Sequence, residues 1–239
     1  TIAGSVLVVY GAFLDGKMAN PLAQLLTASI MAAPAAVAVA LTMIPETTPS
    51  TERMKEPDFN YAPTMDAFPT GATDGLKIVL NLTTMLIAAL ATLGLINAGL
   101  VLFPDGMGAP LSIERVLGWV FAPLMYMIGV PWAEASQSGS LMGVKTVLTE
   151  FVAFLQLAEL PVDAMDPRTR IITAHAICGF ANFGSMGILI GGLSIVEPER
   201  RDDFLTLAWR TLLAGTLATC LSGAVVGALP YQLFAGVGG

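Results

Sequence analysis

The sequence has little charge. Of its 239 residues only 12% are charged, 55% are apolar, and the mean hydropathy is +0.73. Soluble domains carry about a quarter charged residues, so this chain cannot cover a water-facing surface, and an ordinary soluble domain is excluded. Intrinsic disorder is excluded too, because it requires low hydrophobicity and high net charge.

Cysteine and histidine are also scarce. Cys178 and Cys220 lie inside apolar runs, so there is no disulfide framework, and both are expected to pack as small residues. The single histidine, His175, is interpreted either as a proton relay or as an inert, hydrogen-bonded residue. GxSxG, HExxH and Walker motifs are absent, as is any cluster of Cys and His ligands. These absences argue against an enzyme and against a resident cofactor.

The charges that are present leave long gaps between them. A membrane-spanning helix needs about 20 apolar residues, and four charge-free gaps of 26 to 29 residues exceed that length. The sequence therefore predicts an all-α, multi-pass protein of an inner or plasma membrane. We therefore expect lipid around the spans. The net charge of −7 argues against a nucleic-acid partner. The gaps are Met18–Pro45, Ile78–Pro104, Ile171–Val196 and Thr211–Gly239.

The pattern divides the chain into seven segments. The order of glycine-bearing and plain spans suggests an inverted repeat, a frequent feature of transporters. Because the chain starts inside an apolar segment, we expect it to be the back part of a longer protein. We expect the end of a first repeat at 1–44 (half of a broken helix and a spanning helix), a proline-rich hydrophilic loop at 45–75, a spanning helix at 76–104, an interfacial helix at 111–131, a re-entrant hairpin at 132–160, a broken span at 167–196 and a last span at 199–230.

The interfacial assignment rests on composition. The segment opens with Ser112 as a candidate N-cap and carries Trp119, Tyr126 and Trp132. Amphipathic aromatics collect at the membrane surface. A short tilted span remains an alternative.

The hairpin contains the strongest candidate for chemistry. Its apolar patches are about half the length that a span requires, and Lys145 and Glu150 separate them. Ionisable groups at membrane depth are costly and usually functional. We interpret Glu150 as an acceptor for a polar solute or a cation, and the alternative is a structural ion pair with Lys145.

A glycine-rich stretch, CGFANFGSMG, interrupts the span at 167–196. Glycine lowers helix propensity, and unwound backbone at mid-membrane forms substrate and ion sites in transporters. Asn182 and Ser185 would share a face there. The opening residues TIAGSV have a similar small, polar character. Close helix packing explains both stretches equally well.

These motifs resemble the C-terminal part of the concentrative nucleoside transporters. The resemblance covers essentially the whole chain in the family's order. The matching stretches are TIAGSVL, LLTASIMAAPAA, PET, GATDGLKI, FAPLMYMIGVPW, GVKTVLTEFVAF, CGFANFGSMGI, PERR and LLAGTLAT.

The resemblance implies a homotrimer that takes up nucleosides with sodium or protons by an elevator-like movement. It implies that Glu150 and Asn182 bind ribose hydroxyls and that Ser185 lies beside them. Two positions depart from the family. Thr149 stands where many members have Asn, Phe154 stands where many have Tyr, and both changes reduce the hydrogen-bonding groups near the hairpin. The remaining implied contacts are Phe180 and Val6 to base and sugar, and Thr1 and Ile2 to sodium.

Two functions follow from this resemblance. The first is an ion-coupled nucleoside symporter without a cofactor other than the coupling ion. The second is a nucleoside-sensing or gating membrane protein that binds without moving solute. Accumulation of nucleoside against its gradient discriminates between the two.

Overall fold

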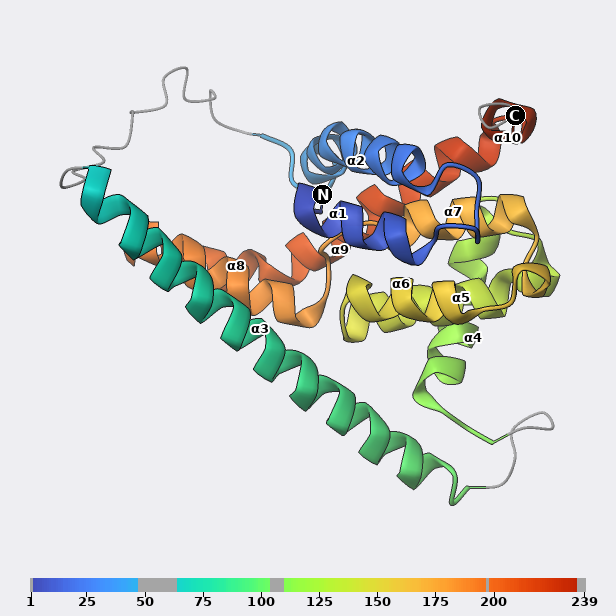
Figure 1. The fold of residues 1–239 in the computed structure, drawn as a ribbon, viewed down its shortest axis with the longest axis horizontal. Helices are drawn as coiled ribbons and strands as arrows, with labels where there is room; N and C mark the ends of the chain where they lie inside the picture. Colours follow the sequence, from blue (N-terminus) through green and yellow to red (C-terminus); the bar gives the residue numbers. More distant parts are fainter. Residues whose placement is uncertain (1, 47–63, 104–109, 197, 236–239) are drawn as a thin grey trace.

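The computed structural model describes residues 2–46, 64–103, 110–196 and 198–235. Within these ranges every regular element is a helix. Among them α2 and α9 are each long and apolar enough to cross a membrane, and the bent pair α4 and α5 meets the same criterion together. The predicted all-α class is thus confirmed, and its broken and bent helices are visible in Figure 1.

The chain begins with two packed helices, α1 (Gly4–Phe13) and α2 (Pro21–Met43). Gly16 and Asn20 in the turn between them have φ angles of +67° and 47°. Glycine and asparagine tolerate this left-handed region. Pro21 then starts α2. At this first position a backbone N–H would have no partner within the helix, so its absence in proline costs no hydrogen bond.

Helix α3 (Thr64–Leu100) extends away from the rest of the protein (Figure 1). It begins within the hydrophilic segment predicted as a loop, whose residues 47–63 lie outside the described part of the chain. Hydropathy marks the part of a helix that crosses lipid and does not mark its polar ends, which explains the early start. The predicted span at 76–104 stays a prediction.

A polar clasp joins the end of α3 to the start of α4 (Ile113–Met127). Asn97 donates from Nδ2 to both carboxylate oxygens of Glu114, at 3.2 and 3.0 Å. Its Oδ1 accepts the backbone N–H of Ile113 at 2.8 Å. The clasp satisfies a free donor at the helix start, and Glu114 lies in the first turn, where a negative charge is favourable.

Helix α5 (Trp132–Val147) packs closely along α4 after a bend of 118°. Gly129 in the bend has a φ of +106°. Two glycines make the close packing feasible, because a Cβ at Gly118 would lie 2.7 Å from the Ser136 carbonyl, and one at Gly139 would lie 2.7 Å from the Gly118 carbonyl.

Helix α6 (Glu150–Glu159) follows α5 after a short break, and η1 (Val162–Ala164) leads into α7 (Pro167–Ile177). The guanidinium of Arg170 closes the C-terminal end of α6. It donates to the carbonyls of Leu157, Leu160 and Pro161 at 2.8, 3.5 and 2.7 Å. These carbonyls would otherwise lack partners at the helix end.

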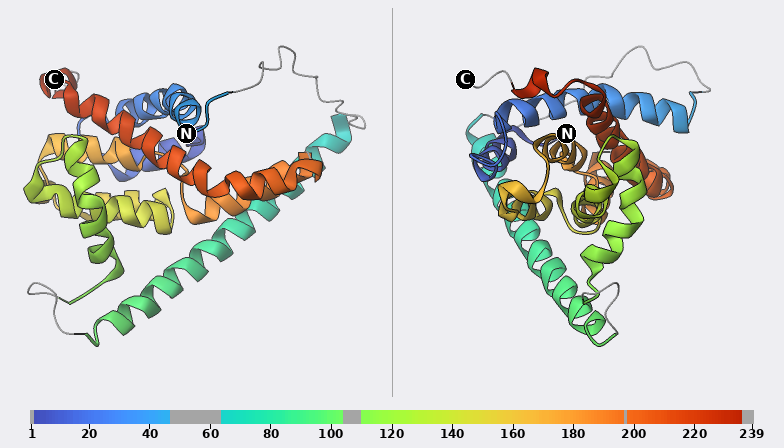
Figure 2. Two further views of the ribbon diagram at one scale, coloured as in Figure 1. Left: turned by 180° about the vertical axis from the view of Figure 1, so that it is seen from behind. Right: turned by 90° about the vertical axis from the view of Figure 1, so that its right-hand side faces the viewer.

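The chain then breaks after α7 and continues as α8 (Phe183–Val196), η2 (Pro198–Arg200), α9 (Arg201–Ala228) and α10 (Gln232–Ala235). Helix α9 is the central element of this half, since it packs against α2, α7 and α8. In the left view of Figure 2, α9 is the long orange-red helix that runs from the end of α8 towards the C-terminus. The break between α7 and α8 is thereby held against α9.

Candidate functional site

Glu150 is the first residue of α6, immediately after the break in the hairpin. The Oγ1 of Thr149 caps this helix by accepting the Val152 N–H at 3.4 Å. A threonine therefore fulfils the capping role that asparagine also performs at such positions. The start of a helix favours a negative charge, which suits the Glu150 carboxylate. Glu150 is only 5% exposed.

Two neutral donors hold the Glu150 carboxylate. The hydroxyl of Tyr10 in α1 donates to Oε1 at 3.3 Å. The Nδ2 of Asn182 donates to Oε2 at 3.2 Å. The carboxylate thus connects α1, α6 and the break between α7 and α8. A carboxylate has about four acceptor positions, so it keeps capacity for a further donor.

Asn182 and Ser185 cap α8 reciprocally. The Ser185 N–H donates to Asn182 Oδ1 at 2.7 Å, and the Asn182 N–H donates to Ser185 Oγ at 3.0 Å. The Ser185 hydroxyl also donates to the Asn182 carbonyl at 2.7 Å. This is the geometry of a capping box. Because the cap uses Oδ1, the amide must turn its Nδ2 towards Glu150.

The backbone between Ile177 and Asn182 is held in tight turns. The Gly179 N–H donates to the Ile177 carbonyl at 2.8 Å, and the Ala181 N–H donates to the Gly179 carbonyl at 2.9 Å. Gly179 lies against α9, since a Cβ there would come within 2.4 Å of Cγ2 of Thr219. Only glycine fits this approach without movement of Thr219.

Aromatic side chains form a wall beside the carboxylate. The ring of Tyr10 stacks on Phe154 with centroids 4.4 Å apart, and Phe151 lies against both Tyr10 and Phe13. Sequence reasoning missed Tyr10. It lies one helical turn after Val6, so a search of the Val6 face for polar groups would have found it.

A cavity of about 250 Å³ opens beside Glu150. It has one carboxylate, hydroxyls from three helices or their caps, and apolar walls. Such a mixture of apolar lining and few polar groups is typical of small-molecule sites. Its lining residues are Val6, Tyr10, Thr83, Thr149, Glu150, Phe151 and Phe180.

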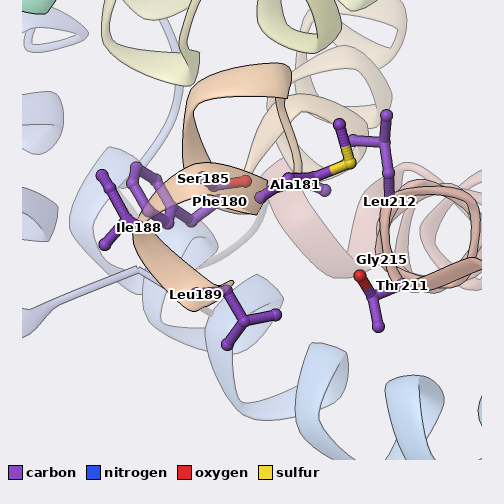
Figure 3. A pocket seen from close by; sticks show the side chains of 9 residues that line it. Phe180, Ala181, Ser185, Ile188, Leu189, Thr211, Leu212 and Gly215 are labelled. Atoms are coloured by element: carbon purple, nitrogen blue, oxygen red, sulfur yellow. The ribbon is translucent and has the colours of Figure 1, made fainter. Parts of the chain in front are cut away.

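Phe180 also lines a second cavity of about 290 Å³, between α8 and α9. Figure 3 shows its ring beside Ser185 and Ile188, with Leu212 and Gly215 across the cavity. The side chain is 41% exposed, so it is free to contact a ligand. Phe180 therefore lines both the carboxylate cavity and this apolar one.

The other sequence candidates lie apart from this cavity. Ile2 is a buried core residue before α1, and Thr1 lies outside the described residues. His175 donates from Nδ1 to the Ile171 carbonyl at 3.0 Å and lines neither cavity. In the described part of the chain no three His, Cys, Asp or Glu side chains gather as metal ligands.

The alternative interpretation of Glu150, a direct ion pair with Lys145, does not match the geometry. Lys145 Nζ instead donates to Thr219 Oγ1 at 3.3 Å. The Glu150 oxygens accept from Tyr10 and Asn182.

A buried carboxylate between two helix breaks is an arrangement that membrane transporters use for their solute sites. A family model described as "Na+ dependent nucleoside transporter C-terminus" matches residues 24–227. The chain belongs to this family, whose members are transporters, and it is a multi-pass membrane protein.

Relatives from bacteria and from a mammal agree with this assignment. The chain is 39% identical over 95% of its length to the uncharacterized transporter YutK of Bacillus subtilis, covering 56% of that protein. It is 37% identical over 96% to solute carrier family 28 member 3 of Mus musculus, covering 35%. It is 33% identical over 95% to the nucleoside permease NupC of Helicobacter pylori, covering 54%.

Solved structures match the fold as well. The whole chain superposes on CNTnw in an inward-facing substrate-bound state with a TM-score of 0.82 and 36% identity, covering 56% of that chain. An outward-facing variant of CNTnw gives 0.83. The chain thus spans about half the length of the structures it matches.

Proposed function

We propose that the chain is the C-terminal part of an ion-coupled nucleoside symporter and that Glu150 binds the ribose. The observation that carries the proposal is the buried carboxylate at the edge of a cavity, held by Tyr10 and Asn182. The family and its named nucleoside permease support the substrate class. The family description names sodium and so favours sodium over the proton as the coupling ion.

The chemistry of a ribose suits this arrangement. Its vicinal hydroxyls are donors, and a carboxylate accepts such bonds more strongly than a neutral group does. Asn182 uses one amide hydrogen on Glu150 and keeps a second for a hydroxyl oxygen. Ser185 fixes the Asn182 amide through the cap. Phe180 and Val6 line the same cavity and supply apolar contacts to base and sugar.

The coupling ion orders the same elements. Thr1 and Ile2 precede α1 directly, and α1 carries Tyr10 to the carboxylate. A cation bound by oxygens at this start would fix α1 before the nucleoside arrives. Each ligand then lowers the ordering cost of the other, which is coupling in its thermodynamic sense. We further propose the homotrimer that the family resemblance implies.

Radiolabelled uridine uptake into proteoliposomes that hold the full-length protein tests the proposal. Separate sodium and proton gradients identify the ion, and uptake above equilibrium establishes a symporter. Glu150→Gln should weaken uridine affinity about 10- to 100-fold, because hydrogen bonds to a charged group contribute about 1.5–3 kcal/mol. Glu159→Gln is the matched control, since Glu159 is exposed on the same helix.

Two results contradict the proposal. Saturable binding without accumulation under either gradient means a sensor or gating protein. Unchanged uridine affinity in Glu150→Gln means that the carboxylate is not the ribose ligand.

A further inference from the structure

A second ionisable side chain, Lys145, is completely buried near the site. It lies in the last turn of α5, five residues before Glu150, and it is 0% exposed. Burying an ammonium group without a compensating charge strongly destabilises the folded protein, because the group loses its hydration. Its direct partner is the hydroxyl of Thr219 at 3.3 Å. A neutral hydroxyl alone does not balance a full charge, so the structure must compensate Lys145 in another way.

Glu150 provides the opposite charge. Lys145 lies in the last turn of α5 and Glu150 is the first residue of α6, with only two residues between the helices, so the opposite charges attract each other although they make no direct ion pair. Both hydrogen bonds that Glu150 accepts come from neutral groups. In the described part of the chain, Arg170 is a second buried cation, and it is bound to carbonyls at the opposite end of α6. Lys145 is therefore the cation placed to balance the carboxylate of Glu150.

Thr219 connects Lys145 to the helix break. Its Oγ1 accepts from Lys145 and donates to the Thr216 carbonyl at 2.9 Å within α9. Its methyl group faces Gly179, where a Cβ would come within 2.4 Å. One α9 residue thus contacts the hairpin lysine and the break that carries Asn182.

We infer that Lys145 is a positioning residue for ribose binding, acting through Glu150, and that Thr219 fixes it against the helix break. The inference rests on the proposed function. Lys145 stabilises the charge of the carboxylate from within the protein. The ribose hydroxyls then meet a charged acceptor at a fixed position.

A double-mutant cycle in the full-length transporter tests this role. Lys145→Met keeps the length of the side chain and removes its charge. We expect uridine affinity to fall about 10-fold, the size of one electrostatic contact in a partly screened interior. In a Glu150→Gln background the same change should have little further effect. Binding of 2′,3′-dideoxyuridine, which lacks the vicinal 2′ and 3′ hydroxyls, should change little.

A purely structural role gives a different result. Lys145→Met would then lower affinity for uridine and for dideoxyuridine by the same factor, in both backgrounds, and the inference would be wrong. Unchanged uridine affinity overturns it as well. If the parent protein binds uridine without dependence on Glu150, the proposed function and the inference fail together.

Variants of Thr219 keep the test decisive if Lys145→Met does not fold. Thr219→Val removes the acceptor at nearly constant shape, whereas Thr219→Ser retains it. We expect the valine variant to lose uridine affinity selectively and the serine variant to keep it. Ser222→Ala is the matched control, because that buried hydroxyl donates only to the Ala218 carbonyl of its own helix. Equal behaviour of the valine and serine variants contradicts the inference.

Discussion

Asn182 donates a hydrogen bond from Nδ2 to Oε2 of Glu150 at 3.2 Å, although 32 residues separate the two in the chain. Asn182 immediately precedes α8, and Glu150 is the first residue of α6. Each residue therefore lies where a helix starts again after a break. The bond makes the two helix breaks one site, and substitutions at either residue report on both.

Asn182→Asp separates the two roles of Asn182. Aspartate is as good an N-cap as asparagine, so α8 should retain its start. The substitution replaces a donor by a second carboxylate beside Glu150 and should lower uridine affinity at least about 10-fold through repulsion and the lost bond. Isothermal titration with uridine and thermal unfolding in detergent measure the two effects. Unchanged uridine affinity would show that the Asn182 amide does not contribute to ribose binding.

Tyr10→Phe removes one of the two donors to Glu150 and keeps the ring stacked on Phe154. A hydrogen bond to a charged group contributes about 1.5–3 kcal/mol. We expect a loss of about this size, shared between stability and uridine affinity. Tyr126→Phe, at an exposed tyrosine that packs edge-on against Trp132, is the control and should change neither.

Gly179→Ala should be destabilising by about 1–3 kcal/mol, the usual cost of overpacking. The added Cβ meets Cγ2 of Thr219 at 2.4 Å. Gly187→Ala is the matched control within α8, because a Cβ there meets nothing within 4 Å. This second variant should be stabilised by about 0.5–1 kcal/mol, since alanine replaces glycine inside a helix. Thermal unfolding of both proteins checks the opposite signs.

Arg170→Met should reduce stability strongly with little effect on substrate affinity. The side chain closes the end of α6 through the carbonyls of Leu157, Leu160 and Pro161. Leaving buried acceptors unpaired costs about 1–3 kcal/mol each. Arg210→Met, at an exposed arginine of α9, should be nearly neutral. A lowered unfolding temperature with an unchanged KM of the folded fraction is the expected result.

Much of the fold and part of the site could be predicted from the sequence. Charge-free runs predicted helices, and the charges of Lys145 and Glu150 indicated the break between α5 and α6. Glycines around Asn182 indicated the second break. The structure brings Glu150, Asn182 and Ser185 together and places Val6 and Phe180 on the cavity. Their roles in binding stay predictions.

Other features depend on tertiary packing, which local patterns do not contain. Tyr10 looks like any apolar-helix aromatic until α1 packs on α6. The partner of Lys145 could not be predicted, because Thr219 lies 74 residues away. Thr83 reaches the cavity from α3 for the same reason. Hydropathy also could not place the start of α3 at Thr64, since its first turns are polar.

The contact between Gly179 and Thr219 constrains how the family can diverge at this point. A larger residue at position 179 requires a smaller one at 219. Loss of the threonine hydroxyl would in turn leave Lys145 without its acceptor. Serine at position 219 lacks the methyl group that a Cβ at position 179 would meet and keeps the hydroxyl that Lys145 uses. A residue larger than glycine at position 179 should therefore occur together with serine at position 219 rather than with threonine.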